Sequence, residues 1–129
     1  MSTVKANTYL AASGSPTEEP SIPALDQRMA KAWVHFDGTG TTHIVKAYNV
    51  SSITDYAVGH WDISMANPMP DSDYIWVGTC MKYTQWYPCI TQRSNYSKTT
   101  TIIPIGTSDA YSNTGWFDSP SVAVTVFAN

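Results

Sequence analysis

The chain has 129 residues, a formal net charge of -3 and a sequence pI near 5.4. A chain of this length forms one domain that buries roughly two-thirds of its unfolded surface, so it needs no disulfide or metal to fold. Its seven Lys and Arg residues are scattered, which argues against a nucleic-acid partner. No apolar run reaches the ~18 to 20 residues of a membrane-spanning helix. Residues 1–10 also lack the hydrophobic core of a secretory signal, so we expect a soluble protein made in a cytoplasm.

The composition favours β-strands over helices. Leu10 and Leu25 are the only leucines, whereas Val, Ile, Thr and Ser are abundant, and glycine and proline recur along the chain. β-branched residues suit strands, and glycine and proline mark the turns between them. We therefore predict an all-β protein, an antiparallel β-sandwich of jelly-roll-like type.

Residues 1–28 differ from the rest of the chain. The run from 11 to 23 is small, polar and proline-containing, and it holds the only two glutamates, Glu18 and Glu19. Such a segment has too little apolar surface to form a core. We predict an extended N-terminal attachment arm over residues 1–28 and a β-sandwich domain over residues 29–129. Pro23 and the residues after it allow a short helical turn over 24–30.

A β-hairpin is predicted directly after the arm. Ala32, Val34 and Phe36 alternate with polar or exposed positions in a strand over 30–37, and a second strand runs over 42–50. The Gly38-Thr39-Gly40 sequence between them supplies left-handed conformations for the turn. Residues 51–55, SSITD, are rich in hydroxyl and carboxylate groups and indicate an exit turn.

Five more strands are predicted over 57–65, 73–81, 87–93, 98–105 and 121–128. In the first of these, one face is expected to contain Ala57, Gly59, Trp61, Ile63 and Met65. In the last, Val122, Val124 and Val126 share a face, and the opposite face is left for solvent or another subunit.

Four sequence stretches resemble a known family. They are KAWVHFDGTG at 31–40, YNVSSITD at 48–55, MPDSDY at 69–74 and VAVTVFAN at 122–129. Together they resemble a short module of tail-fibre and other virion structural proteins of tailed bacteriophages, especially marine and cyanobacterial ones. The resemblance implies a protein of the virion tail, assembled in the host cytoplasm as a homotrimer. The arm of residues 1–28 would then join it to other tail proteins.

Catalysis is poorly supported by the sequence, and we predict no enzymatic activity. A glycosidase needs two carboxylates held roughly 5 to 9.5 Å apart. The acidic residues instead lie mainly beside turn residues, as Asp37, Asp55, Asp71 and Asp73 do. Asp62 lies within a predicted strand, where we expect it to face solvent. No nucleophile motif is present.

We predict neither a metal nor a cofactor. His35, His43 and His60 form no H-x-H pair, and we expect exposed strand histidines. Cys80 and Cys89 lie nine positions apart, without the spacing of a zinc site. We favour two partly buried free thiols, with a hairpin disulfide as the alternative.

Aromatic residues provide the best candidate contact surface. The chain has five Trp and eight Tyr, and several of them gather with amides and carboxylates in two segments near the C-terminal half. Rings bury the C–H faces of sugars while polar groups satisfy the hydroxyls. The predicted receptor or glycan contacts are Tyr83, Trp86, Tyr87, Tyr96, Asp109, Tyr111, Asn113, Trp116 and Asp118. Alternatively, these rings pack beneath loops or between subunits.

The sequence therefore predicts a tail-fibre or tail-associated protein that attaches to host surface polysaccharide. Two alternatives stay open: a head or tail decoration protein without receptor binding, and a stand-alone carbohydrate-binding module. The aromatic residues between 83 and 117 distinguish them, because a decoration protein would bury these rings in a protein interface.

Overall fold

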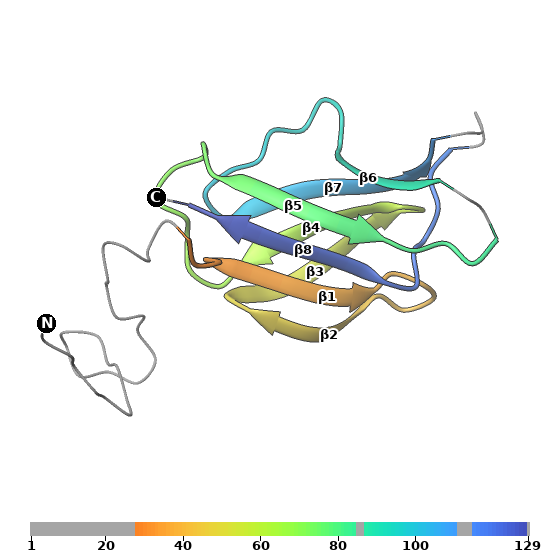
Figure 1. The fold of residues 1–129 in the computed structure, drawn as a ribbon, viewed down its shortest axis with the longest axis horizontal. Helices are drawn as coiled ribbons and strands as arrows, with labels where there is room; N and C mark the ends of the chain where they lie inside the picture. The colour runs from red at the N-terminus through yellow and green to blue at the C-terminus, as the bar shows by residue number, and fades with distance from the viewer. Residues whose placement is uncertain (1–27, 85–86, 111–114, 129) are drawn as a thin grey trace, which may run out of the picture.

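The computed structural model describes residues 28–84, 87–110 and 115–128, which form two packed antiparallel sheets (Figure 1). One sheet has the strand order β2-β1-β8-β5 and the other β3-β4-β7-β6. The predicted all-β sandwich is confirmed. The strands are β1 (Ala32–Asp37), β2 (His43–Tyr48), β3 (Val50–Ala57), β4 (His60–Met65), β5 (Ile75–Cys80), β6 (Pro88–Gln92), β7 (Ile102–Asp109) and β8 (Val122–Phe127).

The N-terminal arm lies outside the described residues, apart from Arg28, and so does most of the predicted helical turn over 24–30. Among the described residues no helix is long and apolar enough to cross a membrane.

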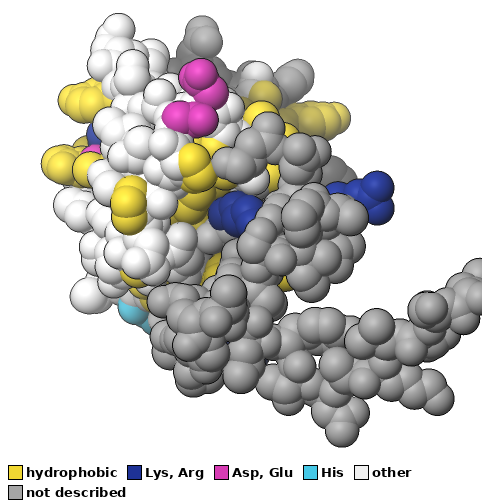
Figure 2. Space-filling view, turned by 90° about the vertical axis from the view of Figure 1, so that its left-hand side faces the viewer, with side chains coloured by type: hydrophobic (Ala, Val, Ile, Leu, Met, Phe, Trp, Pro, Cys, Tyr) yellow, Lys and Arg dark blue, Asp and Glu magenta, His cyan; other side chains and the backbone are white. Residues whose placement is uncertain are grey.

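Figure 2 looks onto the end of the sandwich beside the C-terminus, where hydrophobic side chains form separate patches with few charged groups between them.

The core lies between the two sheets and follows the predicted alternation. In the first sheet, Ala32, Val34 and Phe36 of β1 are buried opposite the three valines of β8, which are buried as well. In the second sheet the buried face of β4 consists of Trp61, Ile63 and Met65. The faces predicted for the strands that form β1 and β8 are therefore confirmed, and so are the positions of Trp61, Ile63 and Met65 on the buried face of β4.

A single residue, Asn49, joins β2 of the first sheet to β3 of the second. Its backbone is left-handed, with φ 53°, a conformation that Asn tolerates better than most residues. Its side-chain amide donates to the Lys31 carbonyl at 3.0 Å, and its Oδ1 accepts from the Asn67 N–H at 2.8 Å. The exit turn predicted over 51–55 is wrong, because the chain reverses at Asn49 and those residues belong to β3.

The strand predicted over 57–65 is wrong in part, because a turn at Val58 and Gly59 divides it into the end of β3 and all of β4. Gly59 has φ 70°, and a Cβ there would lie 2.7 Å from the Phe117 backbone nitrogen. Ala57 is exposed rather than on the buried face. The apolar alternation runs through this turn without a break, which concealed it.

The strand predicted over 98–105 is shifted along the chain, because β7 runs from Ile102 to Asp109. Thr99 Oγ1 accepts from the Thr101 and Ile102 N–H groups at 3.2 and 3.0 Å. A hydroxyl that bonds local backbone in this way competes with strand pairing and holds a turn.

Asp37 and Asp71 stabilise turns as expected. Each carboxylate accepts a hydrogen bond from the backbone N–H two residues later, at 2.8 Å in both cases. Asp55 differs, because it lies in β3 and its Oδ2 accepts from Thr42 Oγ1 at 2.9 Å.

The side chain of Trp61 extends from β4 in the second sheet to the β1–β2 turn of the first sheet. Its ring meets the Phe36 ring edge-on, with centroids 5.5 Å apart, and its indole N–H donates to Thr42 Oγ1 at 3.3 Å. A Cβ at Gly38 would lie 2.4 Å from the Trp61 ring. Gly38 is therefore needed for space, whereas Gly40, with φ 61°, supplies the left-handed conformation of the turn.

This contact makes a prediction for Gly38→Ala. The added methyl group meets the Trp61 ring, and overpacking of this kind costs roughly 1 to 3 kcal/mol of unfolding free energy. In a Trp61→Phe background the smaller ring leaves room, so the same glycine substitution should cost less. Urea unfolding of the wild type, both single variants and the double variant measures this coupling. Strictly additive losses would contradict the contact.

Candidate functional site

A groove of about 400 Å³ opens on the outer face of the β3-β4-β7-β6 sheet. Its volume falls within the range of roughly 300 to 1,000 Å³ that is typical of ligand sites. The lining comes from the β3–β4 hairpin, the segment after β6 and the segment after β7. It consists of Tyr56, Ala57, His60, Arg93, Ser94, Tyr96 and Trp116.

Arg93 is held in one orientation at the groove. It follows β6, and its backbone N–H donates to the Pro104 carbonyl at 3.1 Å. Its guanidinium carbon lies 4.9 Å from the centroid of the Tyr56 ring and 4.1 Å from that of the Tyr96 ring. Cation–π contacts of this kind each contribute roughly 0.5 to 1 kcal/mol at exposed sites. The two rings and the strand end therefore fix the cation.

Asp62 completes this arrangement from β4. Its Oδ1 accepts from Arg93 Nη2 at 3.0 Å, and only 14% of its side chain is exposed. The expectation that Asp62 faces solvent is therefore wrong. The carboxylate is needed by the buried guanidinium, because removing one partner of a buried ion pair leaves an uncompensated charge.

One nitrogen of Arg93 remains unsatisfied. Within the described residues, Arg93 Nε is the only buried side-chain nitrogen or oxygen without a hydrogen-bond partner. The whole residue is 7% exposed. Leaving a buried donor unpaired costs roughly 1 to 3 kcal/mol of folding free energy, so the Nε–H of Arg93 is a donor for which a ligand could supply the acceptor.

Trp116 forms the opposite part of the groove. Its ring lies over Gly106 of β7, where a Cβ would come within 2.5 Å of the ring. The His60 ring is tilted against it, with centroids 4.4 Å apart. Backbone pairing of the residue with Ser108 holds the segment on β7. The ring is therefore fixed on one side and 39% exposed overall.

The surroundings of His60 favour its neutral form. Burial, and secondly the nearby charge of Arg93, lower the pKa of His60 below its usual value of 6.5. The neutral imidazole presents one donor nitrogen and one acceptor nitrogen to the groove.

The groove unites residues from both predicted aromatic segments, namely Tyr96 and Trp116. Tyr83 and Tyr87 are largely exposed but do not line it. Three other predicted contact residues lie outside the described residues: Trp86, Tyr111 and Asn113.

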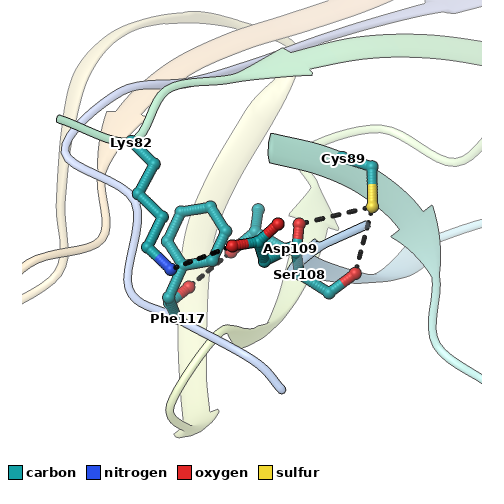
Figure 3. Close-up of polar contacts among 6 residues, drawn as sticks. Lys82, Cys89, Ser108, Asp109 and Phe117 are labelled. Atoms are coloured by element: carbon teal, nitrogen blue, oxygen red, sulfur yellow. Dashed lines mark hydrogen bonds and ion pairs between the residues drawn. The ribbon is translucent and has the colours of Figure 1, made fainter. Parts of the chain in front are cut away.

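The two predicted acidic contacts serve the fold. Asp109 is buried, and its Oδ2 lies 3.9 Å from Lys82 Nζ, which sits over the Phe117 ring (Figure 3). Asp118 Oδ1 accepts a hydrogen bond from the Gly59 N–H at 2.7 Å and so stabilises the β3–β4 turn. Neither carboxylate lines the groove.

Sequence reasoning did not select Tyr56, His60 or Arg93 as ligand contacts. Tyr56 and His60 flank the Val58-Gly59 turn, so recognition of that hairpin would have placed them side by side. Arg93 belongs to no motif, and only the pairing of β6 with β7 brings it beside β4.

The cysteines and the other histidines lie elsewhere. Cys80 and Cys89 are half-buried free thiols, as expected. Burial, with a contribution from Cys89, raises the pKa of Cys80 to about 11. Cys89 Sγ lies 3.1 Å from Ser108 Oγ (Figure 3). In the part of the chain that the structure describes, no three His, Cys, Asp or Glu side chains could hold a metal ion.

The described residues of the groove lining offer ring faces, a fixed cation and hydrogen-bonding groups, and no carboxylate pair for acid–base chemistry is among them. Comparisons with protein-family models, curated proteins and solved structures found no match to this chain. The groove itself is therefore the main evidence for function.

The lowered pKa of His60 predicts a specific pH dependence of stability. As pH falls below about 6.5, the unfolded chain takes up a proton at this position before the folded chain does, so unfolding becomes easier. His60→Gln should lose less stability than wild type between about pH 7.5 and 5.5, measured by urea unfolding. Equal losses in both proteins would contradict a neutral His60 in the folded state.

Proposed function

We propose that this chain is a virion structural protein of a tailed bacteriophage, a tail-fibre or tail-associated component that attaches to host surface polysaccharide through the aromatic groove. It acts by binding and has no catalytic role. The observation that carries the binding part is the groove, in which exposed rings surround a fixed guanidinium. The sequence resemblance at 31–40 and 48–55 supports the virion part.

The groove suits a sugar for a physical reason. Tyr56, Tyr96 and Trp116 are 62%, 58% and 39% exposed, so each offers apolar ring surface to a ligand. A sugar ring presents C–H groups on its faces and hydroxyls around its edge. The aromatic ring faces can pack against the C–H groups of the sugar. Arg93, Ser94 and His60 can form hydrogen bonds with its hydroxyls.

Several copies would act together in a particle. The proposed assembly is a homotrimer, joined to other tail proteins through residues 1–28 after synthesis in the host cytoplasm. Linked sites bind with avidity that exceeds any single affinity by roughly 10²- to 10⁴-fold. A shallow groove with a weak individual affinity is then sufficient for attachment.

The groove predicts the effect of Tyr96→Ala and Trp116→Ala. Stacking is worth roughly 0.5 to 1.5 kcal/mol beyond area burial, so each change should weaken adsorption to host polysaccharide roughly 2- to 12-fold. Because both rings are partly exposed, the melting temperature should stay within a few degrees of wild type. Adsorption assays and thermal unfolding measure the two effects.

Tyr83→Ala provides the matched control, because Tyr83 is 80% exposed and does not line the groove. It should leave adsorption unchanged. A large drop in melting temperature for Tyr96→Ala or Trp116→Ala, with adsorption per folded particle intact, would count against the binding role.

A second candidate function is a head or tail decoration protein, and one observation favours it. One part of the outer face of the β2-β1-β8-β5 sheet is apolar, because cross-strand pairing places Tyr48 beside Trp33 and Ile75 beside Phe127. Val77 extends the same face from β5. Exposed apolar patches of this kind mark protein interfaces. The homotrimer proposed above would use this face as well.

The apolar face predicts the outcome of Ile75→Lys combined with Val77→Lys. Both residues are more than half exposed, at 64% and 57%, so the monomer should fold unchanged. We expect the wild type to sediment as a trimer and the double variant as a monomer. Val58→Lys, at a valine 59% exposed beside the other sheet, should remain trimeric. A monomeric wild type at tens of micromolar would contradict the proposed assembly.

A further inference from the structure

Among the described residues, the groove lining offers hydrogen-bond donors and one guanidinium, but no negatively charged acceptor. Arg93, Ser94 and Trp116 bring N–H and O–H groups, and the lining that the structure describes contains no Asp or Glu. Asp109 and Asp118, which would have served as acceptors for sugar hydroxyls, are used by the fold instead. A neutral sugar needs acceptors as much as donors, whereas an anionic group is an acceptor only.

Arg93 has donor capacity left after pairing with Asp62. A guanidinium carries five N–H donors in a planar fork, and the ion pair with Asp62 is made through Nη2 at 3.0 Å. Nε is buried and has no partner in the described part of the chain. The guanidinium therefore keeps donors that are not paired with Asp62, and the ion pair holds it in a fixed orientation.

A ligand can reach this fork through the side chains that cover it. Tyr56 and Tyr96 lie against the guanidinium, yet they are 62% and 58% exposed themselves. Exposed side chains change rotamer within picoseconds to nanoseconds. Displacement of either ring by a ligand uncovers the unpaired N–H, and hydrogen bonds from a cation to an anion are roughly twice as strong as neutral ones.

We infer that the ligand of the groove is an acidic saccharide, a uronic or sialic acid unit whose carboxylate is bound by Arg93 while its ring packs on the groove aromatics. This inference rests on the proposed function of the groove as a glycan site and names the class of glycan. Arg93 is the specificity-determining residue. Asp62 positions the guanidinium and reduces its net charge.

Matched ligands test the inference directly. The full chain is titrated by calorimetry with oligogalacturonates, glucuronate-containing oligosaccharides and sialylated oligosaccharides, and with the carboxyl methyl ester of each. The ester keeps the sugar and removes only the charge. We expect at least one acid form to bind tenfold or more tightly than its ester, with an affinity that falls as salt rises.

Two variants assign the effect to Arg93. Arg93→Lys keeps the charge but loses the fork, so it should lose most of the preference for acid over ester. Asp62→Asn keeps a neutral acceptor for Nη2 and removes the competing charge, so it should bind the acid form more tightly than wild type does. Tyr83→Ala, outside the groove, should match wild type. Circular dichroism confirms the fold of each protein.

The outcomes separate the inference from the proposed function. Equal binding of an acid and its ester, or binding of neutral oligosaccharides alone, overturns the inference and leaves glycan binding intact. Binding of no acidic or neutral oligosaccharide overturns both. Full acid preference in Arg93→Lys, or weaker acid binding in Asp62→Asn, overturns the assignment to Arg93.

Discussion

The packing of Trp61 against the β1–β2 turn is the contact on which the rest of the sandwich depends. The indole N–H bonds to Thr42, and Thr42 in turn donates to Asp55, so a polar chain closes the edge of the core. Gly38 lies against the ring, and its own N–H donates to the Ser119 carbonyl at 2.8 Å. One buried ring therefore ties together both sheets and the segment that leads into β8.

The same segment builds the groove. Ser119 is fully buried, and its hydroxyl bonds to the Met81 and Ser121 carbonyls at 2.8 Å each. Phe117 bonds through its backbone to Thr107 of β7. Trp116 is thereby placed over Gly106 by contacts that continue the core outward. A binding surface held in this way is set by the fold rather than by ligand, which lowers the entropic cost of binding.

Much of the fold could be predicted from the sequence, because period-2 alternation depends on burial alone. The valines of β8 and the apolar face of β1 are examples. The corner at Asn49 and the turn at Gly59 could not, since each depends on one residue whose role is set by distant backbone. The candidate site was predictable only in part. Tyr96 and Trp116 can be selected from the sequence because they are aromatic. The role of Arg93 cannot, because it depends on a side-chain contact with Asp62, 31 positions earlier in the chain, that only the pairing of the strands creates.

The two faces of the sandwich have different surfaces, and they point in opposite directions. The apolar face belongs to the β2-β1-β8-β5 sheet and the groove to the other sheet. Any assembly that buries the first face leaves the second turned outward, so self-association and ligand contact do not compete for surface. In the proposed particle, each added subunit would contribute another outward-facing groove, and the geometry of the particle, rather than the chemistry of one groove, would set the spacing of the receptors that it engages.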